Sequence, residues 1–266
     1  RQWGDKWTLN ATARADKNQN FKWLFSPAAS IVYRPTAQTV WRLGFSSAVR
    51  NPTLQDQYLY YNVGRALLLG NLNGYDSLVT IDEVGDFLAA GPQDRANWQW
   101  QYYSMPGVRP EQVRNIELGY RSTWWDRLYL DATYYYSWYT DFIGYHLALK
   151  IDDNPGGSAA DRLRGVEAYR LASNAQERVT TQGFSIGANY YIKRYTLAGN
   201  YTWNVLNSGA DDPIIPAYNT PEHKYNLSIS GRDLNWKLGK GRCGYTLAYK
   251  WVEGFLFEGS PQFTGR

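Results

Sequence analysis

The chain has 266 residues and a formal net charge of +4, with 44% hydrophobic and 17% aromatic residues. Its mean hydropathy of -0.55 and the lack of any apolar run of about eighteen residues exclude a helical membrane protein. The charge is too small and too dispersed to favour nucleic acid, and the lone Cys243 excludes an internal disulfide. The 12 Trp and 23 Tyr are typical of the aromatic girdles of membrane β-barrels, although sugar-binding β-proteins are also rich in aromatic residues.

Apolar and polar residues alternate along much of the chain, which is the pattern of β-strands with one apolar face. The clearest stretch runs from Leu128 to Trp138, where Leu130 and Tyr134 share a face and Asp131 points the opposite way. In chain order the alternation predicts nine strands, near residues 6–15, 25–34, 39–49, 113–124, 128–138, 183–192, 195–205, 225–229 and 245–251. A tilted strand of about ten residues is long enough to cross a bilayer.

The connections between these strands alternate in length. The sequence predicts tight turns at 34–38, 124–127 and 192–194, a longer turn at 233–242, and long loops at 51–109, 144–178 and 206–221. Bacterial barrels keep short turns in the periplasm and long loops outside, so we expect the three long loops to be extracellular. Residues 65–69 and 78–87 are apolar enough to form packing segments within the longest loop.

The strand count and the start of the chain both predict a piece of a larger protein. Bacterial barrels have an even number of strands and no open edge, whereas nine strands are predicted here. The first residues, Arg1 to Asp5, resemble neither a signal peptide nor the start of a secreted protein. We therefore expect an internal segment of a larger closed barrel.

Five segments, in this order, resemble motifs of the TonB-dependent receptors of the Gram-negative outer membrane. The first is FSSAVRNPTL at 45–54, which is similar to G-F-R-x-P-T-L, and the second is VRPE at 108–111 with Asn115, Glu117, Gly119 and Tyr120, which is similar to K-P-E…N-x-E-x-G-Y. The third is YYYSWYTDFI at 134–143, which is similar to Y-Y-x-x-Y-x-D-x-I. The fourth is LASNA at 171–175 with QGF at 182–184, similar to N-x-x-x-x-x-x-G-[FV]-E, and the fifth is TPEHKYNL at 220–227, similar to T-P-x-H-K-x-N-L. Ser185 stands where the fourth motif commonly has Glu. The motifs extend over roughly residues 26–251, and they resemble most the receptors of Bacteroidetes-type bacteria.

This resemblance implies an all-β fold, an antiparallel transmembrane β-barrel segment of about nine or ten strands within a plugged barrel of about 22 strands. Residues 1–266 would be a partial barrel domain, roughly strands 11 to 19, without the plug, the N-terminal strands and the last strands. The implied location is the outer membrane, in contact with lipid. The implied partners are the plug, the remaining strands of the barrel and the inner-membrane TonB complex, reached through a TonB box in the absent N-terminal part; some relatives also carry a surface lipoprotein.

The resemblance further implies a receptor that captures and imports a scarce, bulky nutrient. Ferric siderophore, haem, cobalamin and oligosaccharide all remain open as its ligand. It implies no enzyme activity, no cofactor and no nucleic-acid partner.

Charged residues on the polar faces of the strands are the first candidates for ligand contact. By strand parity Arg14, Arg42, Arg50 and Arg121 point into the lumen together with Glu117 and Asp131, as do Arg34, Lys224, Lys250 and Asp141. An excess of positive charge there would attract an anionic ligand such as a ferric siderophore. The structural alternative is that these charges pair with each other and with the plug, because charges in a partly buried lumen need partners.

Aromatic residues in the longest loop are the second candidates. They are Tyr58, Tyr60 and Tyr61, and the cluster Trp98, Trp100, Tyr102 and Tyr103. Their broad apolar rings could stack on an aryl siderophore, a porphyrin or a sugar. The alternative is that they fold the loop onto itself.

Neither a catalytic nor a metal site is predicted. The two histidines, His146 and His223, have no metal-ligand spacing, and no Ser-His-Asp order, P-loop or C-x-x-C occurs. Three other kinds of protein stay open from the residues alone. They are a passive porin-like small barrel, an outer-membrane protease or lipase, and a soluble β-sandwich adhesin.

Overall fold

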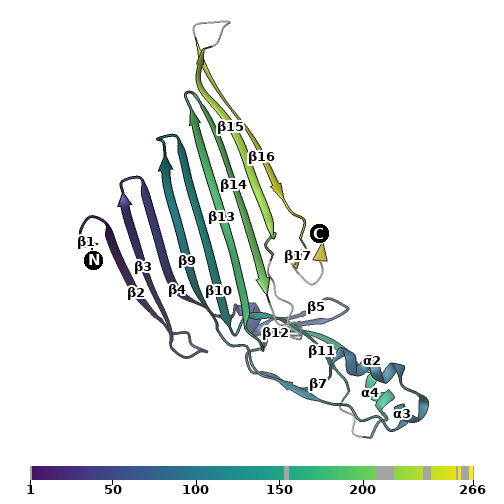
Figure 1. Ribbon diagram of the computed structural model, residues 1–266. Coiled ribbons are helices and arrows are strands. Elements are labelled where there is room, and N and C mark those ends of the chain that lie inside the picture. The colour runs from purple at the N-terminus through teal and green to yellow at the C-terminus, as the bar shows by residue number, and fades with distance from the viewer. Residues whose placement is uncertain are drawn as a thin grey trace.

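The computed structural model describes residues 2–152, 156–207, 219–235, 241–255, 257–258 and 264–265. Within these residues its main element is an antiparallel sheet in the order β1-β2-β3-β4-β9-β10-β13-β14-β15-β16 (Figure 1). These strands are β1 (Gln2–Trp3), β2 (Trp7–Asp16), β3 (Leu24–Thr36), β4 (Thr39–Arg50), β9 (Glu111–Trp124), β10 (Leu128–Thr140), β13 (Val179–Ile192), β14 (Tyr195–Asn207), β15 (His223–Asn235) and β16 (Arg242–Val252). All nine strands expected from the alternation are confirmed, and β1 adds a short edge strand.

Each strand of this sheet pairs with the strand that follows it in the order given above. Short turns at one end of the sheet join β3 to β4, β9 to β10 and β13 to β14. The turn between β9 and β10 has positive φ at both Trp125 and Asp126, which is the type I′ geometry that matches the twist of paired strands. Over the described residues the sheet stays open, with β1 and β16 at its edges. An open sheet is what a segment of a larger barrel requires, so the predicted fold class is confirmed. The predicted turn at 233–242 lies partly outside the described residues.

The register separates an apolar face from a polar face. One row of directly paired residues crosses all nine long strands on the apolar face: Trp7, Tyr33, Trp41, Tyr120, Ala132, Ile186, Tyr201, Tyr225 and Trp251. Many of its rings touch, with centroids 4.2 Å apart for Trp7 and Tyr33 and 4.5 Å apart for Trp41 and Tyr120. The face stays largely exposed, which suits lipid and would be unstable in water.

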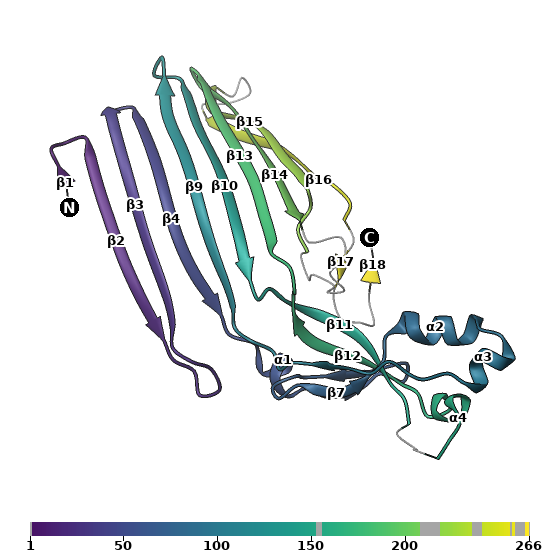
Figure 2. The same ribbon diagram turned by 60° about the horizontal axis from the view of Figure 1, so that its bottom comes forward.

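The long loops 51–109 and 144–178 gather at the other end of the sheet, where they form a folded unit (Figures 1 and 2). This loop unit contains β5 (Tyr60–Asn62), β6 (Leu67–Leu69), β7 (Tyr75–Leu78), β8 (Tyr103–Met105), β11 (Ile143–Lys150) and β12 (Glu167–Asn174), with the helices α1 (Leu54–Tyr58), α2 (Ile81–Ala89), α3 (Pro92–Ala96) and α4 (Ala159–Leu163). A mixed sheet in the order β11-β12-β6-β5 joins the loops 51–109 and 144–178, since β6 pairs parallel to β12. The remaining strands are β17 (Phe257–Glu258) and β18 (Thr264–Gly265).

Two hydrophobic clusters hold the loop unit together. The first surrounds Leu69, Leu78 and Leu171, and the second surrounds Phe87 and Trp100. Both apolar segments predicted within the longest loop supply these buried residues, so their packing role is confirmed. Three of the short helices begin at polar caps, in which Thr53, Thr80 and Ser158 accept backbone N–H groups.

None of the helices in the described residues is both long enough and apolar enough to cross a membrane.

Candidate functional site

The polar face of the barrel sheet carries most of the predicted charged candidates, and many of them pair. Arg121 Nη2 lies 2.6 Å from Asp131 Oδ2 on the neighbouring strand, and Arg14 Nη2 lies 2.6 Å from Asp16 Oδ1. These pairs are the arrangement expected of the structural alternative, in which the charges hold one another. The same row continues through Gly187, Asn200 and Asn226 to Lys250, and Asn226 Nδ2 donates to Asn200 Oδ1 over 2.8 Å.

Arg42 and Glu117 differ from these pairs, because they line a hollow in the polar face. The hollow measures about 440 Å³ and is walled by small residues of β2, β3 and β4, Gly44 among them. The Arg42 guanidinium lies across Gly119, where an added Cβ would come within 3.0 Å of Nε. Both side chains are half-buried, and among the described residues neither has an ion partner within 4.0 Å. A second hollow of about 290 Å³ lies along β10, β13 and β14 around Asp131 and Gly187.

At the loop end of the barrel strands, residues from three of the recognised motifs meet. Arg109 Nη2 lies 2.5 Å from Asp141 Oδ1. Asn174 joins both residues, since its Nδ2 donates to Arg109 O over 2.9 Å and to Asp141 O over 2.7 Å, while its Oδ1 accepts from Arg109 N over 2.7 Å. Beside them, Glu111 accepts from Ile143 N over 2.9 Å and pairs with Arg50 at 3.3 Å. These motif residues therefore fasten the ends of β9 and β10 nearest the loops to the loop unit.

We expect Asn174→Asp to loosen this connection. The substitution preserves the size of the side chain and the acceptor for Arg109 N, but it puts an anionic oxygen against two carbonyl oxygens that lose their donor. The local opening free energy of residues 105–111 and 139–144 should fall by about 2–3 kcal/mol. Amide hydrogen exchange of the detergent-solubilised protein measures this, and Asn189→Asp on the polar face of β13 is the control. Equal protection in both variants would show that Asn174 does not hold the rim.

A hollow of about 290 Å³ opens beside Asn174, between the barrel rim and the loop unit. Its lining includes Tyr103, Arg109, Tyr139, His146 and Arg178. The Tyr103 hydroxyl and His146 Nε2 are 2.9 Å apart, and burial raises the pKa of Tyr103, which keeps its hydroxyl protonated. The hollow therefore offers both donors and acceptors next to aromatic rings.

The predicted aromatic candidates fall into two groups. Tyr58, Tyr60 and Tyr61 are 57%, 75% and 53% exposed, and the Tyr58 hydroxyl accepts from Asn20 Nδ2 over 2.7 Å. Trp98 and Trp100 instead pack against Phe87, with centroids 5.5 Å and 4.9 Å away, and Trp100 is buried. These two residues serve the fold of the loop unit. Tyr102 is exposed and Tyr103 half-buried.

Sequence reasoning missed two groupings. His146 lines the rim hollow and bonds there to Tyr103, which precedes it by 43 residues. His223 lies with Glu222 and Glu253, whose ligand atoms are all within 4.8 Å of one another. The adjacent Glu222 was the only sequence signal, because Glu253 reaches the group through the pairing of β15 with β16.

Comparisons with known proteins agree with this geometry. The family model described as TonB dependent receptor-like, beta-barrel matches residues 2–262. No curated protein sequence matches the chain.

Solved structures show the same fold at low sequence identity. The FrpB iron transporter from Neisseria meningitidis (F5-1 variant) aligns with a TM-score of 0.57 and 16% identity over 94% of this chain and 31% of that one. A double mutant of the Serratia marcescens hemophore receptor HasR, in complex with its hemophore HasA and heme, gives 0.54 and 12% over 93% and 39%. The ferric enterobactin receptor PfeA in complex with BCV-L6 gives 0.54 and 14% over 93% and 35%.

The chain thus spans well under half the length of these structures. The family match excludes the soluble β-sandwich adhesin and the outer-membrane protease or lipase, because the family consists of transport barrels. Its location in the outer membrane follows from the family; the Bacteroidetes-type origin stays a prediction. With its nine long strands, its apolar outer face and its family match over residues 2–262, the chain belongs to the TonB-dependent receptors as part of their β-barrel domain.

Proposed function

We propose that this chain supplies part of the barrel wall and part of the ligand-capture surface of an outer-membrane active transporter. The observation that carries the proposal is the position of the loop unit. It sits at one end of the barrel strands, while tight turns close the other end (Figure 2). Such a unit, folded from the loops 51–109 and 144–178, is extracellular in this proposal and meets the ligand before the lumen does. The loop 206–221 lies mostly outside the described residues.

The transported ligand in this proposal is a scarce, bulky nutrient of the class ferric siderophore, haem, cobalamin or oligosaccharide. The structures that share this fold are described as an iron transporter, a hemophore receptor with heme, a ferric enterobactin receptor and a copper transporter. These descriptions favour a metal chelate. The exposed Tyr60 and Tyr61 provide ring faces for such a ligand, and Arg42 provides positive charge on the polar face.

In this proposal most of the other charged candidates stabilise the barrel wall and do not bind the ligand. Arg14, Arg50, Arg121 and Asp131 are ion-paired within the barrel wall. Arg42 and Glu117, on the hollow of about 440 Å³, are the charges that a plug domain or a passing ligand would contact. The plug, the other barrel strands, the inner-membrane TonB complex and a surface lipoprotein are the proposed partners.

Uptake by cells that express the complete receptor tests this function. The probes are ⁵⁵Fe-labelled ferric enterobactin, haemin, cyanocobalamin and a fluorescent maltooligosaccharide. Energised import predicts saturable uptake of at least one probe that a protonophore abolishes. Influx that the protonophore leaves unchanged would indicate the passive porin-like alternative.

The double variant Tyr60→Ala, Tyr61→Ala tests the capture surface. Loss of two stacking rings should weaken binding of the transported probe by about tenfold, since one ring contact is worth roughly 0.5–1.5 kcal/mol. The matched control is Trp125→Ala, because Trp125 is as exposed as Tyr60, at 75%, but lies in a tight turn at the opposite end. Equal affinities of both variants and the wild type, measured on whole cells at 4 °C, would remove these tyrosines from the ligand site.

A further inference from the structure

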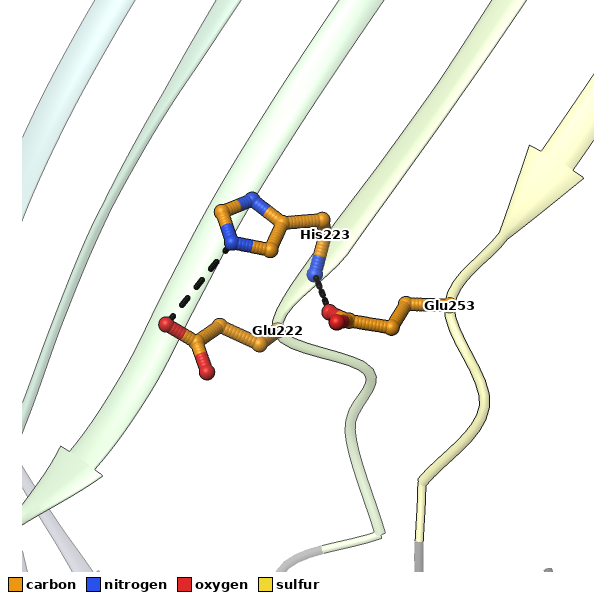
Figure 3. A group of neighbouring side chains, drawn as sticks. All are labelled: Glu222, His223 and Glu253. Carbon is orange, nitrogen blue, oxygen red and sulfur yellow. Dashed lines mark hydrogen bonds and ion pairs between the residues drawn. The ribbon is translucent and has the colours of Figure 1, made fainter.

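Glu222, His223 and Glu253 form a cluster of metal-ligating side chains at the loop end of β15 and β16 (Figure 3). Glu222 directly precedes β15, His223 is its first residue, and Glu253 directly follows β16. Figure 3 shows the Glu222 carboxylate at the His223 imidazole and the Glu253 carboxylate at the His223 main-chain N. The nearest ligand atoms of the three residues lie within 4.8 Å of one another.

We propose that these three residues bind a divalent first-row transition-metal ion, for which zinc is the appropriate probe. The proposal concerns the barrel wall and is independent of the transported ligand.

Neighbouring groups hold each of the three side chains in place. Trp203 Nε1 donates to Glu222 Oε1 over 3.1 Å. Glu253 is fixed by a reciprocal pair, since its N donates to His223 O over 3.0 Å and its Oε2 accepts from His223 N over 3.1 Å. Among the described residues, no hydrogen bond reaches the second oxygen of either carboxylate. Glu253 is thus anchored through Oε2 and leaves Oε1 for a ligand, whereas Glu222 Oε1 both accepts from Trp203 and faces the imidazole.

The imidazole has the orientation of a metal ligand. His223 Nδ1 lies 2.7 Å from the Tyr201 hydroxyl oxygen. The Tyr201 ring also stacks on the imidazole, with the two ring centroids 6.0 Å apart. A histidine whose Nδ1–H donates to such a partner carries its lone pair on Nε2, and this pattern of support is typical of metal-bound histidines. His223 Nε2 is the nitrogen that faces Glu222.

The separation between His223 Nε2 and Glu222 Oε1 also fits a shared ion. It is 3.8 Å, which is too long for a hydrogen bond. Two ligand atoms in a tetrahedral zinc site, each about 2.1 Å from the metal, are about 3.4 Å apart. A small rotation of the half-exposed Glu222 side chain would therefore bring both atoms into contact with one ion.

Charge and ligand type select the kind of metal. Two carboxylates lie together on the aromatic face of the barrel, and His223 is the only basic group within 4.0 Å of either in the described part of the chain. A divalent cation would balance them. One imidazole with two carboxylates suits zinc and related first-row ions, whereas calcium prefers six to eight oxygen ligands.

Zinc binding to the complete, chelator-treated receptor in detergent tests the proposal. Equilibrium dialysis over a range of free zinc gives the number of ions and their affinity for the wild type and for His223→Gln, Glu222→Gln and Glu253→Gln. Both Glu→Gln variants retain an oxygen that can accept the anchoring N–H, so the strand ends should stay folded. We expect each of the three variants to bind one zinc fewer per receptor than the wild type, at a free zinc concentration that saturates this site in the wild type. Tyr201→Phe, which removes only the partner of Nδ1, should weaken that binding by about tenfold.

Two controls and a spectroscopic readout locate the ion. His146→Gln removes the other histidine, and Glu167→Gln removes a carboxylate of the loop unit; both should bind as the wild type does. Zinc X-ray absorption should show one imidazole nitrogen and carboxylate oxygens at about 2.0–2.2 Å, with the nitrogen shell lost in His223→Gln. The same zinc count and affinity in His223→Gln as in the wild type would overturn the proposal, whether or not the receptor imports its ligand.

Discussion

Replacing Asn71 with leucine should detach the two long loops from each other. Asn71 is fully buried, and its Nδ2 donates to Pro106 O over 2.9 Å and to Ala172 O over 3.0 Å, while its Oδ1 accepts from Gly74 N over 3.0 Å. Leucine has a similar size and keeps water out, so all three backbone groups would be buried without a partner. Each such group costs about 1–3 kcal/mol, so we expect a loss of about 3–5 kcal/mol in the local stability of the loop unit.

Hydrogen exchange by mass spectrometry on the complete receptor measures this loss. Peptides covering 103–108 and 168–174 should exchange faster by two or more orders of magnitude, while the barrel strands β9 and β10 keep their protection. Asn73→Leu, two residues away on the exposed side of the same turn, is the control and should change little. Unchanged exchange in Asn71→Leu would mean that the hydrophobic clusters alone hold the loops together.

Replacing Gly70 with alanine should distort the segment that presents the exposed tyrosines. A Cβ at Gly70 would lie 2.3 Å from Tyr58 N and 2.5 Å from Gln57 C, both backbone atoms. That backbone has little room to move, because Gln57 Nε2 donates to Pro52 O over 2.7 Å and Gly70 N donates to Leu59 O over 2.7 Å. The overlap should cost about 3 kcal/mol of local stability.

Exchange of the peptides that contain Tyr58 and Tyr60 gives the measurement, together with their rate of cleavage by chymotrypsin. The matched control is Gly85→Ala in α2, where an added Cβ meets nothing within 4 Å. This second glycine-to-alanine change should stabilise the exposed helix by about 1 kcal/mol. A Gly70→Ala protein as protected as the wild type would show that α1 and β6 separate readily.

The strands and their faces were predictable because they depend on local sequence. Alternation with a period of two places Trp41 and Leu43 on one face whatever the strand pairs with, and the tight turns between neighbours then set the register. Ala132 beside Tyr120 and Tyr201 beside Ile186 follow from that register. The strand ends were harder to place: β13 begins at Val179, four residues before the predicted start, and Val179 is buried against Phe142 and Ala175.

The loop unit was predictable only in part. The apolar segments around Leu69 and Phe87 indicated packing, but their partners are remote: Asn71 bonds to Ala172, 101 residues away. Strands of three or four residues carry too few positions for a period to be visible. Their pairing is decided by side chains that meet after the barrel strands have brought the two loops to the same end.

The sequence by itself determined the class of the protein, since the alternation, the aromatic content and five ordered motifs all indicate a TonB-dependent receptor barrel. Tertiary structure decided which candidates hold the fold and which remain for ligand. Parity places Arg42 and Glu117 on the same face, yet only the pairing of β4 with β9, which the loop 51–109 separates in the chain, puts Arg42 opposite Gly119 and leaves it on a hollow. The same holds for His223, which gains Glu253 as a neighbour only because β15 pairs with β16. Contacts between strands depend on register and closure, and the alternation of residues along one strand does not contain them.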